Sequence, residues 1–137
     1  MNYIIGSDIS KVLDIKDRIY LCGDLKKPQQ LEWIEDERLE IGMSRYKGGE
    51  FQADIPHYHE TNTEYNFVLS GTTKFLLIDE RREMEFEKGS LIVVPPGTKY
   101  ASKHKAGTEI LFIKIPAGDD KVIVDVDESI QDWLKDW

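Results

Sequence analysis

The sequence predicts an all-β fold, either a sandwich or a small barrel, followed by a short C-terminal helix. Apolar residues alternate with polar ones or form short runs, as they do in strands. Turn residues interrupt these runs roughly every ten to twelve residues, which is the spacing of sandwiches and small barrels. A helical period is clear only near the C-terminus. The chain has 137 residues, so we expect one domain: an N-terminal extension over 1–30, strands over 31–126 and a helix over 127–137.

The expected strands follow one another along the chain. In the first, Leu39, Ile41 and Met43 alternate with polar or small residues. A short helix over 7–13 and a loop over 26–30 are expected before it, the charged segment 79–83 is expected to end a later strand, and the basic segment 103–105 is interpreted as an exposed turn. The further strands are expected within 67–69, 75–78, 91–94, 110–115 and 122–126.

The C-terminal helix is predicted from four apolar residues on one face. They fall at i, i+3, i+4 and i+7, and Asp127 or Ser129 can cap the helix start. We expect this face to dock on the outside of the strands, with binding to a partner as the alternative. The four residues are Ile130, Trp133, Leu134 and Trp137.

Composition excludes several classes of partner. The chain has 18 Lys and Arg against 26 Asp and Glu, a net charge of −8, which is unsuited to phosphate neutralisation. We therefore expect neither nucleic acid nor membrane as a partner, and we expect the acidic residues of 119–136 on the outer surface. The single Cys22 cannot form an intrachain disulfide. No signal peptide or membrane span is recognisable, which predicts a cytoplasmic protein.

His57, His59 and Glu64 form the predicted chemical site. Residues i and i+2 of a strand point to one face, about 6–7 Å apart at Cα, so both imidazoles can reach one metal ion. Glu64 has the wrong parity for the same straight strand, and the turn-prone segment 60–63 is expected to bring it back to that face. Two imidazoles and one carboxylate leave coordination positions open, which suits Fe(II) and also Mn, Ni or Zn.

The spacing around these residues resembles the cupin superfamily. Segment 57–71 reads H-x-H, four residues, E, six residues and G, and segment 89–97 reads G, five residues and P-x-G. This resemblance implies a double-stranded β-helix, or jelly-roll barrel, with the metal ligands at one end. It also implies small-molecule chemistry, among which dioxygenases, isomerases and decarboxylases are known.

The chain departs from this pattern where the third histidine ligand is expected. Tyr100 occupies that position, and His104 takes the place of the closing asparagine. A neutral tyrosine, with a pKa of about 10, is a poor ligand, so Tyr100 can ligate, donate a hydrogen bond to bound water, or narrow the pocket. His104 has the same strand parity and lies either at the core edge or in the pocket. We regard both as candidate catalytic residues.

Arg45 continues the odd-numbered face of Leu39, Ile41 and Met43. It is the candidate for binding an anionic substrate at the pocket mouth, and a solvated strand end is the alternative.

The functional prediction is a small protein that binds a divalent metal and a polar small molecule, as an oxygenase or isomerase. One alternative is a non-catalytic protein that binds a sugar or small acid. Another is a metal-free epimerase or isomerase with a histidine and Tyr100 as the proton-transfer pair. The outer sheet face, with Trp133 and Trp137, makes a homodimer the expected assembly.

Overall fold

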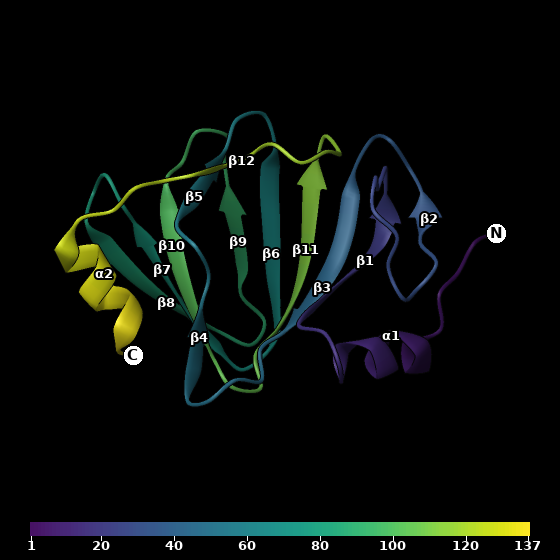
Figure 1. The fold of residues 1–137 in the computed structure, drawn as a ribbon, viewed down its shortest axis with the longest axis horizontal. Helices are drawn as coiled ribbons and strands as arrows, with labels where there is room; N and C mark the ends of the chain where they lie inside the picture. The colour runs from purple at the N-terminus through teal and green to yellow at the C-terminus, as the bar shows by residue number, and fades with distance from the viewer.

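The computed structural model describes residues 1–137 and places them in two facing β-sheets with a helix near each end of the chain (Figure 1). The first sheet has the order β2-β1-β3-β11-β6-β9. Its strands are β1 (Arg18–Gly23), β2 (Ile34–Glu35), β3 (Glu40–Arg45), β6 (Thr63–Ser70), β9 (Leu91–Val94) and β11 (Glu109–Ile115).

The second sheet has the order β12-β5-β10-β7-β8, and β4 also pairs with β10. The chain changes sheet repeatedly, as in a jelly roll, so the all-β prediction is confirmed. Its strands are β4 (Phe51–Ala53), β5 (His57–His59), β7 (Thr72–Leu77), β8 (Arg82–Glu87), β10 (Tyr100–Lys105) and β12 (Lys121–Ile123).

The space between the sheets has an apolar part and a polar part. In the apolar part, buried side chains from both sheets pack together, and Met84 and Phe86 of β8 pack against them. The polar part contains the pocket described below. The buried apolar residues are Val68, Phe75, Ile92, Val94 and Tyr100.

Strand β3 presents the opposite face to the one expected. Glu40, Gly42 and Ser44 are buried, whereas Ile41 and Met43 are only partly buried on the outer face. The interior accepts these residues because Glu40 pairs with Lys114 at 3.0 Å. Gly42 is required there, since a Cβ at this position would lie 2.2 Å from the Phe112 ring.

Three segments differ from their expected structure. β1 pairs with β3, so part of the expected N-terminal extension belongs to the first sheet. No strand was expected between residues 78 and 91, but β8 covers 82–87, and its alternating Met84 and Phe86 face the core. The basic segment 103–105 lies in β10 rather than in an exposed turn, and Lys103 is only 1% exposed.

The two helices lie outside the sheets (Figure 1). α1 (Gly6–Leu13) packs near β1, and α2 (Glu128–Lys135) lies against the second sheet. Asp127 caps α2 by accepting a hydrogen bond from the Ile130 N–H at 3.2 Å. Neither helix has the length and apolar character that a membrane crossing requires.

The predicted docking of α2 is confirmed by its buried face. Ile130 is 2% exposed and packs against Leu76 and Ala101. At the other end, the Lys103 amine donates to the carbonyl of Trp133 at 2.6 Å and lies 3.9 Å from the centre of its ring. Lys103 is therefore buried because it satisfies a C-terminal carbonyl of α2.

Candidate functional site

The three predicted metal ligands come together between the two sheets, on β5 of the second sheet and β6 of the first. In β5, His57 and His59 are 5% and 3% exposed and point inward, with Tyr58 between them on the other face. The turn after His59 returns the chain so that Glu64, near the start of β6, faces them. One ligand atom from each residue lies within 4.8 Å of the other two.

Hydrogen bonds set the orientation of both imidazoles. The Nδ1 atom of His57 lies 2.7 Å from the carbonyl oxygen of Ile55, which can only accept, so Nδ1 carries the hydrogen. The Nδ1 atom of His59 lies 2.7 Å from Oδ1 of Asp120 and donates in the same way. In the neutral form, each histidine therefore presents an unprotonated Nε2, the arrangement typical of metal-binding histidines.

The Nε2 atom of His59 is the clearest sign that a cation fits this site. It is buried and lacks a partner in hydrogen-bond geometry, although Oε2 of Glu64 lies only 2.8 Å away. A lone pair facing a carboxylate is unfavourable unless a proton or another cation lies between them. An ion held by two imidazole nitrogens and a carboxylate satisfies all three groups.

Burial and the neighbouring charges shift the pKa values of the three candidate ligands. Burial alone would lower the pKa of His59, but contacts with the Glu64 and Asp120 carboxylates outweigh it and raise the pKa. Burial would raise the pKa of Glu64, but His59 and Asn66 lower it to about 2. Burial lowers the pKa of His57. Glu64 is therefore ionised and His57 neutral at pH 7.

Tyr100 contacts this cluster as a hydrogen-bond donor. Its hydroxyl lies 2.9 Å from Nε2 of His57 and 3.4 Å from Oε1 of Glu64. Complete burial and then the Glu64 charge raise the pKa of Tyr100 well above its ordinary value, so the phenol stays protonated. The Tyr100 hydroxyl is thus directed at His57 and Glu64, an arrangement that differs from the alternatives predicted for it.

Asp120 belongs to the site although it was expected on the outer surface. Besides His59, it accepts hydrogen bonds from the backbone N–H groups of Thr61 at 2.8 Å and Asn62 at 2.7 Å. Burial opposes ionisation, but these bonds lower the pKa of Asp120 to about 2. The carboxylate thus fixes both the ring of His59 and the turn that leads to Glu64.

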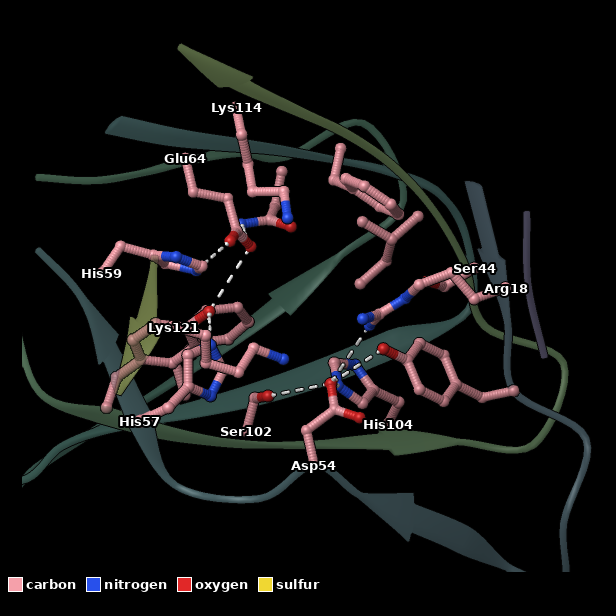
Figure 2. Close-up of a pocket in the computed structure, with 16 residues that line it drawn as sticks. Arg18, Ser44, Asp54, His57, His59, Glu64, Ser102, His104, Lys114 and Lys121 are labelled. Atoms are coloured by element: carbon pink, nitrogen blue, oxygen red, sulfur yellow. Dashed lines mark hydrogen bonds and ion pairs between the residues drawn. The ribbon is translucent and has the colours of Figure 1, made fainter. Parts of the chain in front are cut away.

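A second histidine–carboxylate cluster lines the same pocket. The Nε2 atom of His104 lies 3.1 Å from Oδ2 of Asp54, and its Nδ1 lies 2.8 Å from the Thr73 hydroxyl. The Tyr46 hydroxyl donates to the same Asp54 oxygen at 2.9 Å, and the Tyr46 ring stacks on His104. Both nitrogens of His104 are occupied by protein groups, and Figure 2 shows this cluster apart from His59 and Glu64.

Arg45 lies outside the pocket, so its expected position is wrong. Because β3 turns its odd-numbered residues outward, the Arg45 guanidinium pairs with Asp14 at 2.7 Å and Glu109 at 3.4 Å. The cations that line the pocket are Arg18, Lys114 and Lys121 instead (Figure 2). None of these had a recognisable sequence signal.

The cavity between these side chains is small. Its volume is about 30 Å³, enough for an ion with a water molecule or for a small polar group, since one enclosed water needs about 10–15 Å³ on the same measure. The pocket therefore suits a compact, polar ligand.

Comparisons with known proteins agree with this architecture. The family model for the Cupin domain matches residues 42–114, more than half of the chain. No curated protein matches the chain significantly. A conserved Klebsiella pneumoniae protein with a double-stranded β-helix domain is similar with a TM-score of 0.57 and 14% identity, over 73% of this chain and 90% of that one.

Two further solved structures are similar at comparable levels. KdgF from Halomonas sp. has a TM-score of 0.53 and 19% identity, over 62% of this chain and 74% of that one. Streptomyces Pac13, described as a nucleoside dehydratase, has a TM-score of 0.54 and 23% identity, over 69% and 75%. At these identities the likeness establishes the fold.

Proposed function

Because the chain belongs to the cupin family, we propose that it binds a divalent metal ion through His57, His59 and Glu64 and transfers protons on a small polar molecule. The observation that supports this most directly is the buried Nε2 of His59, which faces the Glu64 carboxylate without a hydrogen-bond partner. Fe, Mn, Ni and Zn all accept this donor set.

The donor set leaves coordination positions for a ligand, as a catalytic site requires. A bound divalent ion would supply Lewis-acid polarisation of a substrate oxygen. The chain's own residues keep the two imidazoles in place: the Ile55 carbonyl orients His57, and the Asp120 carboxylate orients His59. The Asn66 amide holds Glu64 by donating to its Oε1 at 2.9 Å.

Tyr100 is the proposed proton donor. When Nε2 of His57 serves as a ligand, the Tyr100 hydroxyl loses the closer of its two acceptors and can donate to a substrate instead. A protonated phenol next to a substrate oxygen stabilises negative charge that develops there. This favours isomerase-type chemistry, in which such charge develops, over oxygenase chemistry.

Metal analysis of protein purified without chelator tests the proposal. We expect about one equivalent of a divalent ion in the wild type, none in the His57→Ala/His59→Ala variant, and an unchanged content in Tyr100→Phe. Proton exchange between D₂O and small 2-oxo acids, followed by NMR, then tests the chemistry. Tyr100→Phe should lose exchange, whereas Tyr46→Phe removes the same group outside the metal cluster and should retain it. A folded wild type without metal affinity contradicts the proposal.

A metal-free proton-transfer site is the second candidate. It is supported by the 2.9 Å hydrogen bond between the Tyr100 hydroxyl and Nε2 of His57, which already forms a donor–acceptor pair. Exchange that persists after chelation and is lost in His57→Gln would favour this candidate. Ligand binding without any exchange would instead indicate a non-catalytic binding protein.

We also propose that the protein forms a homodimer through the outer face of β6 and β9. Phe67 is paired with Leu91 in the strand register, and both point away from the core. Leu91 is 59% exposed, Val93 47% and Phe67 39%, which leaves an apolar face on the first sheet. Sedimentation of the wild type and of Leu91→Glu, which should be monomeric, tests this interface.

A further inference from the structure

The pocket contains one cation whose charge is fully compensated. Arg18 in β1, Lys114 in β11 and Lys121 in β12 all line it. The Lys114 amine lies 3.0 Å from Oε2 of Glu40, and that carboxylate is itself buried. Lys114 therefore needs no further anion.

Arg18 has only a long contact with a shared carboxylate, and Lys121 has no such partner. The Arg18 guanidinium donates to the Ser44 hydroxyl at 3.0 Å and reaches Oδ2 of Asp54 only at 4.0 Å, an oxygen that already accepts from Tyr46 and His104. The Lys121 amine makes no hydrogen bond or ion pair with the protein, and its residue stays exposed at the pocket. The charge of Lys121 is thus available to a ligand, and that of Arg18 is only partly compensated.

The strand register directs Lys121 toward the metal cluster. Lys121 is paired with His59 across β12 and β5, and directly paired residues of antiparallel strands point to the same face. Figure 2 shows the Lys121 amine reaching toward the middle of the pocket. Burial and then the charge of Arg18 lower the pKa of Lys121, so the two cations repel each other and an anion between them would be stabilised.

We propose that Lys121 and Arg18 form a subsite that binds the carboxylate of a small organic acid. This deepens the proposed function, on which it rests for the position of the reacting part of the ligand beside His57, His59 and Glu64. A carboxylate matches the planar guanidinium and an ammonium group. Phosphate sites typically add a helix N-terminus, and both helices here lie outside the sheets. The cavity volume of about 30 Å³ also favours a compact planar group.

Calorimetric titration of zinc-loaded and chelator-treated protein with malonate tests this subsite. Malonamide, which has the same shape without the charge, and inorganic phosphate serve as comparison ligands. We expect Lys121→Met to weaken malonate binding roughly tenfold or more without weakening zinc binding. Lys88→Met removes an exposed lysine outside the pocket and should change neither.

The outcomes separate this inference from the proposed function. Malonate binding that depends on Lys121 in a protein without zinc affinity supports the subsite and contradicts the metal proposal. Equal malonate affinity in Lys121→Met and wild type overturns the subsite, and so does a wild type that does not bind malonate. Binding of malonamide or phosphate as tightly as malonate overturns the carboxylate assignment.

Discussion

Two histidine–carboxylate clusters line the same pocket, and they differ in what their histidines leave free. In the first, His57 and His59 each use Nδ1 for a protein acceptor; Nε2 of His57 then accepts from the Tyr100 hydroxyl, and only Nε2 of His59 lacks a hydrogen-bond partner. In the second, His104 uses both ring nitrogens, one on Thr73 and one on Asp54. The first cluster therefore keeps one imidazole nitrogen without a hydrogen-bond partner, as the proposed metal site requires, whereas the second is complete within the protein.

The difference follows from where the partner carboxylates sit. Asp120 approaches His59 from outside the pocket, at Nδ1, and so directs Nε2 inward. Asp54 instead lies at Nε2 of His104 and also accepts from Tyr46. Residue type alone does not distinguish a binding histidine from a structural one, but the occupied nitrogen does.

The largest expected effect comes from replacing one histidine in each cluster. We expect His59→Gln to reduce zinc affinity on the order of a hundredfold or more, since changes that only reorient a ligand already cost 10–100-fold. His104→Gln should keep the stoichiometry and affinity for zinc. Calorimetric titration of both variants measures this, and a comparable loss of affinity in His104→Gln would mean that the clusters are not separate.

Asp54→Asn should affect stability rather than zinc affinity. The Asp54 carboxylate accepts from His104 and Tyr46 and lies near Arg18, and these groups lower its pKa despite burial. Removing the charge leaves its cationic and donor partners without their acceptor, so we expect unfolding free energy to fall by about 3 kcal/mol. Urea unfolding measures it. Asp79→Asn, at an exposed position, should stay within about 0.5 kcal/mol of the wild type.

Asp120→Asn tests whether an outer carboxylate prepares the binding histidine. The amide still fills the space between His59 and the Thr61–Asn62 turn, but it carries no charge to favour the required ring orientation. We expect zinc affinity to fall about tenfold, as for other groups that orient metal ligands. Asp119→Asn changes the exposed neighbouring carboxylate and is the matched control. An unchanged affinity in Asp120→Asn would remove Asp120 from the site.

The first cluster was predictable from sequence because its ligands are local. His57 and His59 share a strand face by alternation, and a short turn separates them from Glu64. The α2 docking face was equally local, since Ile130 and Trp133 are one helical turn apart. The all-β fold followed from the same short-range patterns.

The rest of the site depends on contacts between distant segments. Asp120 and His59 are 61 residues apart in sequence, and Asp54 and His104 are 50 apart. The position of Arg45 was wrongly predicted for the same reason. The even-numbered face of β3, which carries Glu40, points inward because Glu40 pairs there with Lys114 of β11. Arg45, on the odd-numbered face, therefore points outward. Such pairings are fixed by the sheet order, which the local pattern does not contain.

The smallest expected effect is a pH dependence confined to the first cluster. Its contacts raise the folded-state pKa of His59, so in metal-free protein the interaction stabilises fully below about pH 6.5, the unfolded value, and is lost as pH rises through the folded value. Glu64 and Asp120, with pKa values of about 2, stay ionised above pH 6.5. The lowered pKa of His57 changes the stability only below pH 6.5.

The melting temperature of metal-free protein should therefore fall by a few degrees between pH 6.5 and 9. Zinc should reverse this trend, because it binds the unprotonated imidazole and stabilises the folded state more as pH rises. Removing the titrating group in His59→Gln should flatten the metal-free decline, since the ion pair that weakens with pH is then absent at every pH. Scanning calorimetry of the metal-free and the zinc-loaded protein measures these melting temperatures. A melting temperature of the metal-free protein that rises over this range would contradict the charged contact between His59 and its two carboxylates.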